Sequence, residues 1–311
     1  MTNTIDIRSV TRTFGRSVAL DDITLSVPEG AICGLLGRNG AGKTTLMSLV
    51  AGQDRPNSGS VGVFGQNPFE NETVLSQISF VRDNQKYPDD YHLRHVLRIG
   101  PAFAPHWSAD VAAELVDAFR IPTKTPIKKF SRGQLSAVAI VLGLASRAPL
   151  TLLDEPYLGL DVTARALFHD LLLRDYTAHP RTIVLSTHLV EESEALFDRV
   201  LIVDGGRISV DCASDEIADL AFTLSGTADA VDRLSADRTA LLSRTVGGLK
   251  SVTILGTTDD GLVSEARAFG AVIAPVSLQE LVAALGADIP VSASATSDPS
   301  TPVAVKKVAR A

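Results

Sequence analysis

Residues 37–45 are the most informative run of the chain: Gly37, Arg38, Asn39, Gly40, Ala41, Gly42, Lys43, Thr44 and Thr45. An apolar run at 31–36 precedes them, and apolar residues from 43 to 51 recur at helical spacing. A GxxxxGK[ST] pattern between a strand and a helix predicts a phosphate-binding loop. Its glycines let backbone N–H groups converge on phosphate oxygens, and the helix N-terminus adds its dipole. Lys43 supplies a cation and Thr44 offers a hydroxyl to Mg²⁺.

A second apolar run, at 150–153, ends in two carboxylates, Asp154 and Glu155. Nucleotide hydrolysis requires a further Mg²⁺ contact and a residue that orients water, and a strand end is a rigid place for both. By itself, an Asp-Glu pair after a strand is usually a solvated turn. Beside a phosphate-binding loop, we expect Asp154 to hold Mg²⁺ through water. Glu155 is expected to act as general base or to position the attacking water.

The pattern of apolar residues favours an α/β fold with a mostly parallel sheet. Short, continuously apolar runs are typical of strands buried on both faces, and they occur at 31–36, 150–153, 182–186 and 199–203. Helical patterns lie between these runs, as at 164–174. The first thirty residues instead alternate between apolar and polar side chains, which predicts antiparallel strands.

The composition describes an ordinary globular protein of 311 residues, 45% hydrophobic and 21% charged, with a net charge of −7. This charge argues against broad nucleic-acid binding, so no nucleic-acid partner is expected. The widely spaced Cys33 and Cys212 exclude a disulfide scaffold or Cys-based zinc site and fit a reducing compartment. The longest apolar run, 137–145, is shorter than the roughly 20 residues of a spanning helix. Because residues 1–10 also lack a signal-peptide core, we expect a cytoplasmic chain.

Two regions depart from the α/β pattern. Residues 91–119 have helical periodicity, with Ser108 as a helix N-cap, and they predict a helical subdomain at about 85–146. After Arg207 the predicted order is βαββαβ, which matches a small ferredoxin-like unit. The expected organisation is a nucleotide-binding domain at 1–215, a small α+β C-terminal domain at 220–287 and a disordered tail at 288–311.

Three more motifs follow in order: Phe130-Ser131-Arg132-Gly133-Gln134, Leu158-Gly159-Leu160-Asp161 and Ser186-Thr187-His188. With them, the chain up to about residue 210 resembles the ATP-binding cassette (ABC) ATPases, in which such motifs are the signature motif, the D-loop and the switch histidine. The resemblance implies a P-loop NTPase fold of ABC type with an antiparallel β subdomain and a helical subdomain. It also implies ATP hydrolysis with ATP and Mg²⁺ as cofactors.

The signature motif predicts a second phosphate-binding end. Ser131 and the N–H of Gly133 stand at the start of a predicted helix, 134–144, and form an anion site by the same logic as the first loop. The resemblance implies that two copies pack head to tail, so that the signature residues of one copy meet ATP held by the other. Arg132 stands where glycine is common, which leaves the Ser131 and Gly133 contacts intact. Asp161 is expected to serve this interface and to cap the following helix.

Two candidate residues have alternative interpretations. Phe14 stands where the family places an aromatic residue that stacks on adenine, and the alternative is a position in the core. Its place directly before the segment at 18–27 favours stacking. His188 follows a buried strand and would alternatively be a structural histidine. In combination with Asp154 and Glu155, we favour a contact with the γ-phosphate.

One position departs from the family pattern. After the strand at 78–81 the family has a glutamine that touches Mg²⁺ and relays the nucleotide state to the membrane partner, but this register holds Asp83. Either Asp83 is the metal ligand, as a hard oxygen donor, or a longer loop brings Gln85 to the metal. Of the two, we predict Gln85.

The resemblance is closest to stand-alone ATP-binding subunits of bacterial exporters, including the drug and antibiotic-resistance type. It implies two copies of this chain, a separate transmembrane permease subunit and a position on the inner face of the cell membrane. A cytoplasmic ABC ATPase that moves no solute is the alternative.

Two further regions leave the interpretation open. The membrane subunit would dock on the stretch 87–120, where the aromatic side chains either line a groove or belong to the core. These aromatic residues are Tyr87, Tyr91, Phe103 and Trp107. The C-terminal unit is either a ligand-sensing regulator or a packing and dimerisation appendage, and we favour the appendage.

Overall fold

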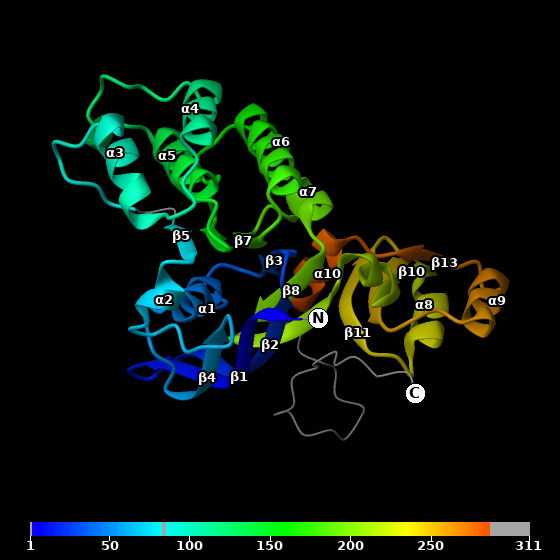
Figure 1. Ribbon diagram of the computed structural model, residues 1–311. Coiled ribbons are helices and arrows are strands. Elements are labelled where there is room, and N and C mark those ends of the chain that lie inside the picture. Colours follow the sequence, from blue (N-terminus) through cyan, green and yellow to red (C-terminus); the bar gives the residue numbers. More distant parts are fainter. Residues whose placement is uncertain (1, 83–84, 287–311) are drawn as a thin grey trace. The chain divides into compact units, whose positions relative to one another are not determined.

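The computed structural model describes residues 2–82 and 85–286, and the chain forms two compact units that part after Ile208 (Figure 1). Each unit has its own cluster of buried hydrophobic side chains. Among the helices of the described residues, none combines the length and apolar character needed to cross a bilayer.

A six-stranded sheet has the order β5-β6-β7-β3-β8-β9. Its strands are β3 (Ile32–Leu36), β5 (Ile78–Arg82), β6 (Leu150–Asp154), β7 (Thr182–Thr187), β8 (Arg199–Asp204) and β9 (Arg207–Ala213). Pairing is parallel from β5 through β6, β7 and β3 to β8, and every residue of β3, β6 and β7 is buried. The predicted buried parallel strands are therefore confirmed. Because these strands run in one direction, their carboxyl ends share one edge of the sheet.

A three-stranded sheet of order β2-β1-β4 covers the phosphate-loop helix α1 (Lys43–Val50). Its strands are β1 (Asn3–Phe14), β2 (Ser17–Pro28) and β4 (Ser58–Val63), and β1 pairs antiparallel with both neighbours. The antiparallel strands expected at the N-terminus are confirmed. Leu46 and Leu49 of α1 share one buried cluster with Ile7 of β1 and Leu35 of β3, so this packing fixes α1 between the two sheets.

The helical part of the first unit follows β5 and groups α3, α4 and α5 (cyan to green in Figure 1). The remaining α-helices of this unit are α2 (Glu72–Leu75), α3 (Leu93–Phe103), α4 (Ala109–Ala118), α5 (Arg132–Ala145), α6 (Val162–Ala178) and α7 (Val190–Ser193). The first unit also contains short 3₁₀ turns at 127–129 and 194–196. The hydroxyl of Ser108 accepts from the N–H of Val111 at 3.3 Å, so the predicted N-cap of α4 is confirmed.

The second unit has a four-stranded antiparallel sheet of order β11-β12-β10-β13 with α8 and α9 packed on it. After a 3₁₀ turn at 214–219, its elements are β10 (Ala221–Thr227), α8 (Ala228–Ser235), β11 (Ala240–Val246), β12 (Leu249–Leu255), α9 (Asp260–Ala268), β13 (Val272–Pro275) and α10 (Leu278–Leu285). The core side chains Phe222, Leu224 and Ile254 face the helices. The tail expected at 288–311 lies outside the described residues.

Candidate functional site

The site lies at the carboxyl edge of the parallel sheet, where three polar residues stand in one register. Arg82 ends β5 opposite Asp154, and Asp154 ends β6 opposite Ser186 of β7. Residues in register on neighbouring parallel strands point to the same face of the sheet. The row therefore projects toward α1, whose residues Thr44 and Ser48 bond to it.

The phosphate-binding loop between β3 and α1 depends on three glycines with left-handed backbone. Gly37, Gly40 and Gly42 have φ of 141°, 82° and 112°, values that residues with a Cβ rarely adopt. A Cβ on Gly37 would lie 2.2 Å from the carbonyl oxygen of Val203, and one on Gly42 would lie 2.7 Å from that of Ala19. The loop is thus held tightly against β8 and β2, with its backbone at the start of α1.

Lys43 is buried inside this loop. Its Nζ donates to the carbonyls of Gly37 at 2.7 Å and Arg38 at 3.2 Å, and it lies 3.8 Å from Oε1 of Glu155. Burial lowers the pKa of Lys43, and the Glu155 and Asp154 carboxylates oppose this shift. The ammonium is therefore fixed between the loop backbone and the carboxylate expected to act on water.

Thr44 and Asp154 form a pair of hard oxygen donors. The Thr44 hydroxyl donates to Oδ2 of Asp154 at 2.7 Å, and the Ser186 hydroxyl donates to Oδ1 at 2.6 Å. Hydroxyl and carboxylate oxygens are the ligands that Mg²⁺ prefers. The donor set fits the predicted magnesium role of Thr44 and Asp154, and Ser186 orients the carboxylate.

Glu155 and His188 meet at this edge although they come from different strands. Nδ1 of His188 donates to Oε2 of Glu155 at 2.8 Å, while Oε1 of Glu155 is buried and has no hydrogen-bond partner in the described part of the chain. Burial raises the pKa of Glu155, and the contact with His188 and the charge of Lys43 partly reverse the shift. Glu155 therefore keeps one carboxylate oxygen for a molecule such as water.

The backbone at Glu155 is left-handed, with φ of 47°. Its N–H donates to the hydroxyl of Ser186 at 3.0 Å, and Tyr157 anchors the following turn. Tyr157 is buried with its hydroxyl 3.1 Å from that of Ser193, and burial raises the pKa of Tyr157 to about 12. These contacts on both sides hold a conformation that costs energy for a non-glycine residue.

The signature residues pack against the D-loop. Ser131 and Gln134 form a capping box at the start of α5. The Gln134 N–H donates to the Ser131 hydroxyl at 3.2 Å, and the Ser131 N–H donates to Oε1 of Gln134 at 3.0 Å. A Cβ on Gly133 would lie 2.5 Å from the carbonyl oxygen of Gly159, and one on Gly159 would lie 3.0 Å from Cγ of Arg132. The glycines thus allow the two motifs to approach each other closely.

Asp161 caps α6, since its carboxylate accepts from the N–H of Ala164 at 2.8 Å. The predicted N-cap role of Asp161 is confirmed. Its predicted interface role stays a prediction, because that role needs a second copy.

Phe14 is exposed, with 51% of its surface accessible, so the alternative core position is wrong. The guanidinium of Arg12 lies over its ring at 4.5 Å from the centroid, and a salt bridge of 2.8 Å to Asp54 fixes Arg12. Phe14 pairs with Ser17 at the tip of the β1-β2 hairpin, and Ala19 of the same hairpin touches the phosphate loop. The ring is an aromatic platform beside the loop, with Arg12 over one of its faces.

The structure does not join Gln85 to this cluster. Gln85 is an exposed loop residue, and Asp83 lies outside the described residues. Residue 82 was not predicted as part of the site, although Nη2 of Arg82 donates to the Ser48 hydroxyl at 2.5 Å. No signal in the sequence pointed to Arg82, because the predicted strand stops at residue 81 and no recognised motif includes residue 82.

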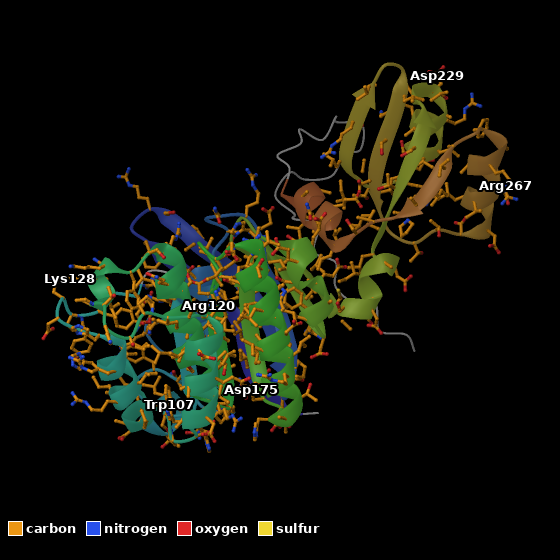
Figure 2. All side chains as sticks on the ribbon, turned by 90° about the horizontal axis from the view of Figure 1, so that it is seen from above. Trp107, Arg120, Lys128, Asp175, Asp229 and Arg267 are labelled. Carbon is orange, nitrogen blue, oxygen red and sulfur yellow. The ribbon has the colours of Figure 1, made fainter. Side chains whose placement is uncertain are left out.

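The aromatic residues of the helical part divide between two environments. Phe103 is 79% exposed and, with Trp107 (labelled in Figure 2), Gly100, Phe80 and Leu142, lines a groove of about 200 Å³. Tyr87 instead has a buried hydroxyl, which raises its pKa to about 12, and Tyr91 packs edge-on against His95. Phe103 and Trp107 therefore line a groove, and the docking of a membrane subunit there stays a prediction.

Comparisons with known proteins are consistent with this geometry. Residues 20–158 match the family model described as ABC transporter. The aliphatic sulfonates import ATP-binding protein SsuB 1 of Burkholderia lata is 32% identical over 207 residues, covering 67% of this chain and 63% of that protein. The Nod factor export ATP-binding protein I of Sinorhizobium fredii is 32% identical over 209 residues, covering 65% of this chain and 61% of that protein. The match spans less than two thirds of either relative's length.

A solved structure described as the ATP binding subunit of an ABC transporter has the same fold. It superposes with a TM-score of 0.62 at 26% identity, covering 70% of this chain and 92% of that one.

Proposed function

We propose that the chain is a member of the ABC transporter family, whose model matches residues 20–158, and that it binds and hydrolyses ATP as the nucleotide-binding subunit of a transporter whose membrane-spanning subunit is a separate chain. The observation that carries this proposal is the convergence of Lys43, Thr44, Asp154, Glu155 and His188 at one sheet edge. A sequence motif alone does not require residues from β6, β7 and α1 to meet at hydrogen-bond distance.

In the proposed mechanism, the loop glycines and Lys43 hold the phosphates of ATP, with Gly37 to Thr45 forming the cradle. Thr44 and Asp154 would hold Mg²⁺, which neutralises phosphate charge when bound. Glu155 orients water through Oε1, which lies 3.8 Å from Lys43 Nζ and has no hydrogen-bond partner among the described residues, and it accepts the proton of that water. His188 keeps the Glu155 carboxylate oriented and is placed to contact the γ-phosphate.

Phe14 would stack on adenine, with Arg12 supporting its other face.

We propose that two copies close around two ATP molecules. Within one chain, Arg132 and Gly133 approach Gly159 of the D-loop, while Ser131 and Gln134 bond to each other at the start of α5. An anion site at the start of α5 then remains for a phosphate held by a second copy. Asp161, next to this contact, would reach the same interface.

The membrane partner is proposed to insert a segment beside Phe103 and Trp107, on the cytoplasmic face of the cell membrane. Export, of the drug or antibiotic type, is the proposed direction. The similarity to a Nod factor export protein supports this direction, and the similarity to a sulfonate import protein supports the opposite one.

The proposed domain organisation is an ATP-binding domain at 1–215, with a helical subdomain at about 85–146, and an accessory α+β domain at 220–287. The division of the chain after Ile208 supports a boundary near this place.

The proposed function is tested by expressing tagged chain in its source cells and purifying it from detergent-solubilised membranes. We expect Mg²⁺-dependent ATPase activity and a co-purifying integral membrane protein. Phe103→Ser should reduce the recovery of this partner without reducing ATPase activity of the isolated chain, and the exposed Phe269→Ser is the matched control. ATPase activity without any membrane partner would indicate an ATPase that moves no solute. The direction is tested with inverted and right-side-out vesicles of the purified complex.

A further inference from the structure

The last residue of β5, Arg82, makes a contact that the proposed reaction does not use. Its Nη2 donates to the Ser48 hydroxyl at 2.5 Å, and that hydroxyl donates to the carbonyl of Thr44 at 2.6 Å. We propose that Arg82, acting through Ser48, is a positioning residue that fixes Thr44 against Asp154 and so sets the affinity of the site for Mg²⁺-nucleotide. This inference rests on the proposed function.

The contacts form a closed circuit. Thr44 donates to Asp154 at 2.7 Å, Asp154 pairs in register with Arg82, and Arg82 returns through Ser48 to the backbone of Thr44. Ser48 lies one helical turn after Thr44, so the circuit holds the first turn of α1 to two strand ends. A circuit of this kind restricts how far Thr44 moves from Asp154.

An arginine at position 82 is energetically costly if its role is only to connect β5 to α1. Ser48 is only 8% exposed, and among the residues that the structure describes, none is a hydrogen-bond partner of the buried Nε of Arg82. An unpaired buried donor is costly, so an apolar residue would pack here at less cost. The guanidinium also lies over the Phe80 ring at 4.6 Å, which fixes its plane and aims Nη2 at Ser48.

The position of Arg82 in the chain gives the circuit a further consequence. Arg82 is the residue at which the chain leaves the sheet toward α3, α4 and α5. A displacement of this strand end would directly change the hydrogen bonds from Arg82 through Ser48 that position Thr44. The circuit thus links the helical part of the unit to the proposed metal ligands.

The test measures ADP binding by isothermal titration calorimetry, in Mg²⁺ and in excess EDTA, for the full-length chain and for Arg82→Met, Arg82→Lys and Ser48→Ala. Mg²⁺ should strengthen ADP binding in the wild type. Arg82→Met and Ser48→Ala should each lower this gain about three- to tenfold, the range expected for the net contribution of one ordinary hydrogen bond, because the lost bond acts on Thr44 only through Ser48. Affinity in EDTA should stay within about twofold, and Arg82→Lys should recover part of the gain.

The double variant Arg82→Met/Ser48→Ala separates a shared circuit from two independent defects. Its loss should equal that of one single variant, because either change opens the same circuit. Arg55→Met is the matched control, since Arg55 also lies over a phenylalanine ring, at 3.8 Å, but on the loop before β4.

Two results overturn the positioning role: an unchanged Mg²⁺ gain in Ser48→Ala, or an equal loss in EDTA. If Arg82→Met does not fold, Ser48→Ala alone decides. A wild-type chain that does not bind ADP would overturn the proposed function itself.

Discussion

His188 Nδ1 lies 2.8 Å from Oε2 of Glu155, although the two residues follow different strands of the sheet, β7 and β6. The histidine lowers the pKa of Glu155, against the larger effect of burial, which raises it. Removing the histidine should therefore raise the pKa of Glu155 further. A general base works only when it is deprotonated, so a higher pKa restricts activity to higher pH.

His188→Ala should consequently lower ATPase activity and move the acid limb of the kcat profile to higher pH. The measurement is steady-state ATP hydrolysis from pH 5.5 to 9 for both proteins. His179→Ala, at an exposed position after α6, is the control and should leave the profile unchanged. An acid limb that stays in place, or moves to lower pH, would contradict the coupling of these two residues.

Lys43→Ala should weaken ATP binding about ten- to a hundredfold, because charged hydrogen bonds contribute roughly 1.5–3 kcal/mol. The change removes the buried cation between the loop carbonyls and Glu155. Binding of a fluorescent ATP analogue gives the affinity. Lys128→Ala removes a half-exposed lysine of the helical part (labelled in Figure 2) and should bind ATP as the wild type does. Equal affinities for all three proteins would exclude the assigned role of Lys43.

Phe14→Ala should weaken ATP binding about tenfold, because stacking of a base on an aromatic side chain contributes roughly 1–3 kcal/mol to binding. Arg12→Ala should have a smaller effect in the same direction, since it removes only the support of the ring. Inorganic tripolyphosphate, which has no base, distinguishes stacking from a general disturbance of the loop. Its affinity should be the same in the wild type and both variants, and a parallel loss would argue against stacking.

The sequence predicted most of this site because its residues stand at fixed places in strand-loop-helix units. Lys43 and Thr44 open a helix after a buried strand, and Asp154 ends another, so parallel pairing alone brings them to one edge. The predicted Ser108 and Asp161 caps depend only on residues three positions away. Such local signals are visible without tertiary structure.

Other features depend on contacts between distant segments and were not predictable. The Arg82–Ser48 bond joins residues 34 positions apart, and neither belongs to a recognised motif. Whether Phe14 is buried depends on how Arg12 and Asp54 meet across the sheet. The sequence favours Gln85 as a metal ligand because of its residue type, but the loop leaves Gln85 exposed.

Truncation after Asp219 tests the second unit. Every proposed site residue precedes Arg207, so the basal ATPase rate should change less than about threefold. The free-energy change that corresponds to this factor is below the usual allosteric coupling range of 1–3 kcal/mol. Loss of an appendage should weaken association of the nucleotide-free chain, measured by sedimentation. A tenfold rise in rate, or a small ligand that stabilises only the full-length protein, would show a regulatory domain instead.

The most direct test of the ATPase assignment is light scattering of Glu155→Gln with and without ATP. The amide keeps the shape of Glu155 but removes the base, so ATP should be bound and not hydrolysed, with turnover reduced at least about a hundredfold. The account predicts that the variant accumulates as a dimer, with a mass near twice the 32.9 kDa of one chain, when ATP and Mg²⁺ are present. A variant that stays monomeric with ATP and hydrolyses it at the wild-type rate would contradict it.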